Sequence, residues 1–209
     1  MSHLLYPAVV ISGILIGYLG WQPDFLAEYS IPELLLYLLI MQVGLGVGMR
    51  PDLKKLIKNF NLKMLMLPVC TITGTLVFTL IASMIFYEDL WTDIMAVGSG
   101  FGYYSLSSVL ISQMKTAAGE IDAAASIAAV ALLANVSREL LALFSCRWLS
   151  ARGKGMTAIS VAGVTSMDVC LPMILGDSRN ADSRLVSAAI FHGIALEISV
   201  PVLITIFCG

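Results

Sequence analysis

Three carboxylic acids stand inside stretches of the chain that are otherwise apolar enough to cross a membrane. Glu139 follows Arg138 in NVSREL, Asp168 lies in TSMDVCLP, and Glu197 follows His192 by five residues in the last apolar stretch. Ionisable side chains at membrane depth are costly, and they usually bind a solute, relay a proton or pair with one another. One arginine cannot neutralise three acids. If all three are ionised, the interior suits a cationic solute; alternatively, one of them carries a coupling proton.

Structural explanations compete with these functional ones. Asn135, Arg138 and Glu139 are spaced i, i+3, i+4 and therefore share one helical face, where an internal salt bridge would explain Arg138 equally well. His192 could titrate near neutral pH, but a lone histidine in a membrane is more often a hydrogen-bonded packing residue. Glu197 could instead face a helix end or a neighbouring bundle.

Glycine and polar residues interrupt two of the apolar segments. The first, VGSGFGYYSLSSVLI, contains Gly98, Gly100 and Gly102, which carry no penalty for non-helical backbone. In the second, SVAGVTSMDVCLPMI, Gly163 precedes the polar run, and Pro172 fits the first turn of a restarted helix. Irregular backbone at membrane depth is tolerated only against protein or a water-filled cavity. The breaks therefore predict a hydrated site with Tyr103, Tyr104, Ser105, Ser107, Thr165 and Ser166 as its further polar residues.

Close helix packing is the alternative for the first break. Gly98 and Gly102 also fit G-x-x-x-G, and hydroxyl groups can hydrogen-bond across helices. Tyr103 and Tyr104 could line a passage or stack on an alkylammonium group, or they could simply pack as aromatic side chains. The density of helix breakers, repeated in a second segment that also carries an acid, favours the functional interpretation.

The elements that must position these residues are membrane helices. Of the 209 residues, 58% are hydrophobic and 12% are charged, and the mean hydropathy is +0.90. A soluble domain carries about 25% charged residues. Continuous apolar runs of the length that crosses a bilayer recur along the chain, without the alternation of a β-barrel. We therefore predict an all-α polytopic membrane protein, without a cofactor, a metal site or a nucleic-acid partner.

The ends of the chain and its cysteines fit the same class. The amino end lacks the basic region of a signal peptide, so residues 4–20 are predicted to be a retained helix. The four cysteines lack CxxC spacing, which predicts small buried thiols and not a metal site: Cys70, Cys146, Cys170 and Cys208.

Charge suggests how the segments are threaded through the membrane. The basic loop 50–63 should be cytoplasmic, which places the amino terminus inside. Residues 1–60 form two leading helices and this loop, and residues 61–209 form a transport core. The candidate spans are 4–20, 32–49, 62–87, 93–114, 120–147, 155–176 and 184–208.

Counting all seven as full spans puts a second basic loop, with Arg147, Arg152 and Lys154, outside. If 93–114 and 155–176 are re-entrant instead, that loop returns to the cytoplasm, so charge favours five full spans and two broken hairpins. The hairpins would then enter from opposite sides, as an inverted repeat requires in transporters with a midplane site.

Four ordered blocks, GSGFGYYSLSS, NVSREL, GVTSMDVCLP and FHG, together resemble the LysO-type lysine exporters of bacteria over nearly the whole chain. The resemblance implies a secondary, proton-coupled antiporter in the cytoplasmic (inner) membrane that exports L-lysine and toxic analogues such as thialysine. It places the family's intramembrane acid on Asp168, its glycine-rich motif on Gly98–Ser107 and its R-E-L triplet on Arg138–Leu140.

Full-length members carry further membrane segments ahead of the region that matches residue 5 onward. The chain therefore resembles the larger piece of a split transporter, and a small membrane protein or a second copy is the expected partner. Two other functions stay open: a non-transporting scaffold subunit, and an intramembrane hydrolase built on a serine and His192. No nucleophile motif accompanies that histidine, so we predict that the protein is not an enzyme.

Overall fold

The computed structural model describes residues 62–86, 91–176 and 183–209, with scattered positions before residue 62. All regular elements in these three ranges are helical, which confirms the all-α membrane class. The chain divides into two compact units, Met1–Gln42 and Val43–Gly209, and the fold and site below belong to the second. The predicted spans 4–20 and 32–49 and most of the basic loop lie outside the described residues.

Three long helices match three of the predicted full spans. They are α5 (Leu62–Phe86), α8 (Ile121–Ala151) and α11 (Ser183–Cys208), and each is long and apolar enough to cross a membrane. At about 1.5 Å per residue, each exceeds the roughly 30 Å of a hydrocarbon core. Large apolar side chains on α5 and α8 point outward, with Phe78 exposed by 74% and Phe144 by 81%. Lipid is the solvent that such surfaces require.

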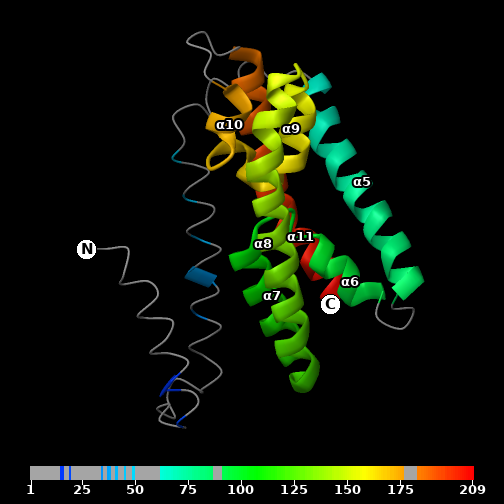
Figure 1. Ribbon diagram of the computed structural model, residues 1–209. Coiled ribbons are helices and arrows are strands. Elements are labelled where there is room, and N and C mark those ends of the chain that lie inside the picture. Colours follow the sequence, from blue (N-terminus) through cyan, green and yellow to red (C-terminus); the bar gives the residue numbers. More distant parts are fainter. Residues whose placement is uncertain are drawn as a thin grey trace. The chain divides into compact units, whose positions relative to one another are not determined.

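The first interrupted segment is a hairpin of two shorter helices, α6 (Trp91–Gly98) and α7 (Tyr104–Ala117). An ion pair of 2.6 Å joins Lys115 Nζ, near the end of α7, to Asp93 Oδ1, near the start of α6. The chain therefore turns back at the break and returns to the end of the bundle from which it started (Figure 1).

The second interrupted segment is also a hairpin. It consists of α9 (Gly155–Ala162), the 3₁₀ helix η3 (Gly163–Met167) and α10 (Leu171–Leu175). At the end of α8, just before α9 begins, the Ser150 hydroxyl donates to the carbonyl of Ile174 in α10 at 2.7 Å. This hairpin lies at the opposite end of α8 from α6 and α7 (Figure 1).

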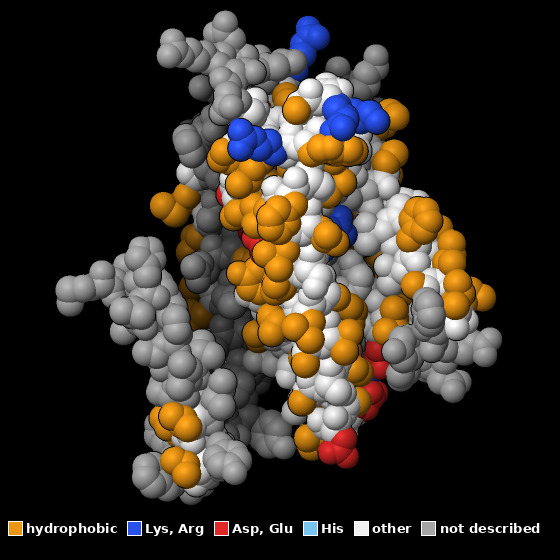
Figure 2. Space-filling view, viewed as in Figure 1, with side chains coloured by type: hydrophobic (Ala, Val, Ile, Leu, Met, Phe, Trp, Pro, Cys, Tyr) orange, Lys and Arg blue, Asp and Glu red, His pale blue; other side chains and the backbone are white. Residues whose placement is uncertain are grey.

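Both segments thus have the geometry that the re-entrant interpretation requires. The charges of the core agree with it. Figure 2 shows Lys and Arg side chains at the end of the bundle where α9 and α10 lie, and Asp and Glu side chains at the end where α8 begins. This asymmetry is the one expected when the α9–α10 end faces the cytoplasm.

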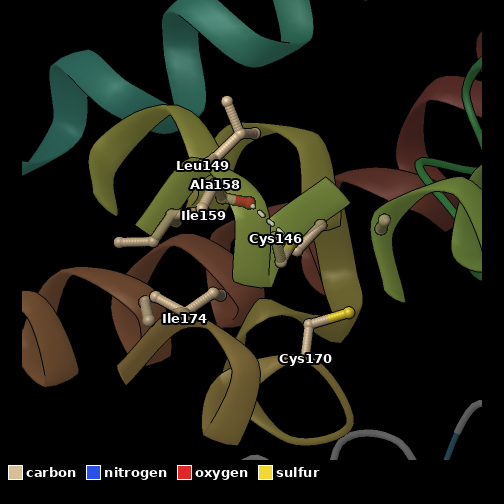
Figure 3. Packing of buried hydrophobic residues seen from close by; sticks show 9 residues of the cluster. Cys146, Leu149, Ala158, Ile159, Cys170 and Ile174 are labelled. Carbon is tan, nitrogen blue, oxygen red and sulfur yellow. Dashed lines mark hydrogen bonds between the residues drawn. The ribbon is translucent and has the colours of Figure 1, made fainter. Parts of the chain in front are cut away.

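Buried apolar side chains hold the second hairpin against α8 and α11 (Figure 3). Within this cluster the thiol of Cys146 donates to the carbonyl of Ala158 at 3.4 Å, and Cys170 is fully buried nearby. All four cysteines are free thiols. The prediction of buried thiols is confirmed for Cys146 and Cys170, but it is wrong for Cys70, which lies on the exposed face of α5, and Cys208 is half-buried.

Candidate functional site

The two breaks meet at the centre of the core. The backbone N–H of Val164, in the second break, donates to the carbonyl oxygen of Phe101, in the first, at 3.1 Å. Gly163 has a φ of +66°, and a Cβ at this position would overlap the same Phe101 oxygen. Only glycine therefore allows the two backbones to approach this closely.

Asn135 of α8 holds the first break in its non-helical form. Phe101 and Gly102 have φ angles of +45° and +91°, and the Asn135 side-chain oxygen accepts from the Gly102 N–H at 2.8 Å. Its Nδ2 donates to the carbonyl of Val97 at 3.1 Å and lies 3.5 Å from the Ser107 hydroxyl. The predicted residues Asn135, Gly102 and Ser107 are therefore brought together, around a buried amide that satisfies backbone groups freed by the break.

A buried hydrogen-bond network surrounds the second break. Ser166 donates to the carbonyl of Ala189 at 3.0 Å, and its hydroxyl lies 3.3 Å from His192 Nδ1. On its other side, His192 Nε2 lies 3.0 Å from the Thr71 hydroxyl, which is 2.7 Å from Ser160. The direction of the bonds at the imidazole depends on its tautomer. The network joins α5, α9 and α11.

The Ser166–His192 pair does not have the arrangement of an activated nucleophile. The hydroxyl hydrogen of Ser166 is directed to a carbonyl oxygen, and the second nitrogen of His192 faces a threonine, where a triad would have an acid. Both side chains are fully buried. The geometry therefore gives no support to the hydrolase alternative.

Arg138 lies where the two breaks approach each other. Its guanidinium nitrogens lie 3.4 Å from the Thr75 hydroxyl and 3.5 Å from the Ser160 carbonyl, and its Cζ is 5.7 Å from the centre of the Phe101 ring. Among the described residues, no carboxylate lies within ion-pair distance of Arg138. The internal salt bridge considered for Arg138 is therefore not formed there.

The three predicted acids lie on different elements of the core. Glu139 is on α8, Glu197 is on α11, and Asp168 directly follows η3. Glu197 is buried in α11, but Asp168 is exposed, and its Oδ1 accepts from the N–H of Val169. Asp168 is exposed because it follows the last residue of η3, where both it and Val169 leave the packed interior.

Other predicted residues have local or peripheral positions. Gly98 packs against Thr79, whose Oγ1 would lie 2.5 Å from an added Cβ, so close packing explains this glycine. Tyr104 and Ser105 are exposed on α7, and Thr165 is buried, with its hydroxyl donating to the Ala162 carbonyl within the second break. Among the described residues, no cluster of three His, Cys, Asp or Glu side chains could hold a metal ion.

Sequence reasoning missed the threonine and serine partners of the site. Thr71, Thr75 and Ser160 are single polar residues in apolar helices, without a motif around them. Each is a hydroxyl residue inside an apolar helix, but such side chains usually hydrogen-bond to the backbone of their own helix, so the sequence does not indicate a site. Only the fold shows that the Thr75 hydroxyl and the Ser160 carbonyl face Arg138, and that the Thr71 hydroxyl faces His192.

The fold and the site together define a polytopic membrane protein in which two opposed broken hairpins meet at a polar, charged centre. The family described as "Lysine exporter LysO" matches residues 7–208, so the chain belongs to this family. This confirms the resemblance.

Two relatives cover almost the whole chain. The chain is 32% identical to "Lysine exporter LysO" of Escherichia coli (strain K12) over 99% of its own length and 64% of that protein. It is 27% identical to the "Putative lysine exporter" of Haemophilus influenzae, over 99% of its own length and 97% of that protein. The chain thus spans about two thirds of one relative and nearly all of the other. No solved structure matches it.

Proposed function

We propose that this protein is a membrane transporter, or the larger subunit of one, that exports L-lysine or a similar cationic amino acid. The observation that carries the proposal is the junction of two backbone breaks inside an apolar bundle, with Glu139 on α8, Glu197 on α11 and Asp168 directly after η3. The names of the two relatives support lysine as the substrate. Three acids and one arginine at the centre favour a solute with net positive charge.

In this mechanism Asp168 binds an ammonium group of the solute or the coupling ion. Its carboxylate is exposed beside the second break, where it accepts a hydrogen bond from the backbone N–H of Val169. Glu139 and Arg138 set the field around it, and polar backbone groups of the two breaks add partial charges. Tyr103 lies at the edge of this field, where its ring can contact the alkyl part of the solute.

Transport is proposed to be secondary and coupled to protons by antiport, across the cytoplasmic (inner) membrane of a bacterium. The opposed hairpins support this class, because transporters built from inverted repeats place their sites between such elements. A small membrane protein or a second copy of the chain is the proposed partner. Co-expression with a neighbouring reading frame, scored by resistance to thialysine, tests that part separately.

The experiment is efflux of radiolabelled lysine from proteoliposomes under an imposed proton gradient, with and without the partner. Asp168→Asn should abolish efflux while the protein still inserts, because it removes the charge and keeps the shape. Asp122→Asn is the matched control, since Asp122 is exposed in the first turn of α8 and should tolerate the change. Efflux retained by Asp168→Asn would remove this residue from the mechanism. A wild-type protein inactive in both settings would favour the scaffold alternative.

A further inference from the structure

The guanidinium of Arg138 has hydrogen-bonding capacity that the described protein does not use. It offers five N–H donors in a planar fork, and its two contacts, to Thr75 and Ser160, are long and go to neutral oxygens. One face of the group lies over the Phe101 ring. No described carboxylate lies within ion-pair distance of Arg138.

A charge in this environment requires a counter-ion. Arg138 is on the central turns of α8, between two backbone breaks, where the dielectric constant is low and an unpaired ion costs several kcal/mol. An arginine fork is also the side chain best matched to a carboxylate, which it can bind through two parallel hydrogen bonds.

We infer that Arg138 binds the α-carboxylate of the transported amino acid. The charges of the core then match those of the solute group by group. Lysine carries one carboxylate and two ammonium groups, and the core offers one guanidinium on α8 and two acids, Glu139 on the same helix and Asp168 directly after η3. A diamine lacks the group that Arg138 requires. This inference rests on the proposed function and adds its selectivity: cationic α-amino acids are accepted, and diamines and amino-acid amides are rejected.

The test is competition against radiolabelled lysine in proteoliposomes preloaded with unlabelled lysine. The competitors are cadaverine, which is lysine without its carboxylate, and lysinamide, in which the carboxylate is a neutral amide. Loss of a charge-assisted bidentate contact should weaken the binding of both by about tenfold or more. Wild-type protein that takes cadaverine and lysinamide as well as lysine would overturn the inference without any variant.

Arg138→Gln removes the charge and keeps a similar length. It should lower the apparent affinity for lysine by about tenfold or more and change the affinity for cadaverine by less than about twofold. The preference for lysine over cadaverine should therefore be lost. Arg138→Lys, which keeps the charge but not the fork, should retain part of the preference. Arg152→Gln is the matched control, because Arg152 also lies over an aromatic ring, Trp148 at 3.7 Å, but beyond the end of α8 and exposed.

The outcomes separate the two levels of the argument. If wild type does not bind lysine, the proposed function fails and the inference fails with it. If wild type binds lysine but Arg138→Gln keeps the same preference over lysinamide, only the inference fails. A lower unfolding temperature with an unchanged preference would mean that Arg138 serves packing, and it would also overturn the inference.

Discussion

Asn135 and Gly100 provide a test of how the first break is held. A Cβ at Gly100 would overlap both the oxygen and the nitrogen of the Asn135 side-chain amide. Replacing Asn135 by alanine removes the acceptor of the Gly102 N–H and the donor to the Val97 carbonyl. It also leaves a space beside Gly100. The two positions should therefore be strongly coupled.

The cost of Asn135→Ala follows from the two backbone groups that it leaves unsatisfied. A buried group without its partner costs about 1–3 kcal/mol, which sets a range of about 2–6 kcal/mol for two groups. Measured side-chain hydrogen bonds between membrane helices average only about 0.6 kcal/mol and reach about 1.7 kcal/mol. We therefore expect the lower end of the range, about 2 kcal/mol of lost unfolding free energy.

Gly100→Ala alone should cost about 1–3 kcal/mol, because it overpacks the site of the amide. In the Asn135→Ala background the new methyl group enters the vacated space, so the double variant should be more stable than the sum of the single effects by about 1–2 kcal/mol. Gly163→Ala is the control for the cycle. A Cβ at Gly163 would overlap the backbone oxygen of Phe101 and would be strained by the φ of +66°. Removal of the Asn135 amide relieves neither effect.

Thermal unfolding in detergent measures these effects, with a thiol-reactive dye that reports exposure of the buried Cys146 and Cys170. Cys70→Ser in every variant removes the signal of the exposed thiol. In the control cycle, the effects of Asn135→Ala and Gly163→Ala should simply add. If the effects of Asn135→Ala and Gly100→Ala also add, the assignment of Asn135 as the support of the break is refuted.

Two further predictions concern the ends of the bundle. Lys115→Met should cost about 3 kcal/mol of unfolding free energy, because the Asp93 carboxylate is left buried without its cation. Adding Asp93→Asn should restore most of that stability. An unchanged unfolding temperature for Lys115→Met would mean that the pair does not close the hairpin. Cysteines introduced at Ala118 and Lys154, both exposed in short turns, should react with a membrane-impermeant thiol reagent from opposite sides, Ala118→Cys from outside and Lys154→Cys from the cytoplasm. The reverse result, Lys154→Cys labelled from outside and Ala118→Cys from the cytoplasm, would favour full spans over opposed hairpins.

The helices and their interruptions could be predicted from the sequence because they depend on local chemistry. Length and apolarity gave 62–87 for a helix that spans Leu62–Phe86. Gly100 and Gly102 on one side, and Gly163 with Pro172 on the other, mark the places where helical hydrogen bonding stops. The charges of the loops then favoured hairpins over full spans, and the ion pair between Lys115 and Asp93 agrees with that prediction.

The contacts of the site could not be predicted, because they join residues that are far apart in the chain. The spacing of Asn135 and Arg138 places them on one helical face, but it does not indicate that one amide caps Gly102 while the neighbouring guanidinium lies over Phe101. The depth of Asp168 was predicted from its neighbours, whereas its exposure depends on the backbone turn that follows η3. Local sequence predicts where a break occurs and not which way its side chains point.

The two breaks are each supported by the helix that follows them in the chain. Asn135 of α8 supports the first break, and His192 of α11 contacts Ser166 in the second, so the same order of hairpin and supporting helix occurs twice with opposite direction. Arg138 lies across this division: it sits on α8 but contacts the Ser160 carbonyl of the second hairpin. A carboxylate bound to Arg138 would therefore touch both halves at their junction, which is where a solute must act if its binding is to change how the halves fit together.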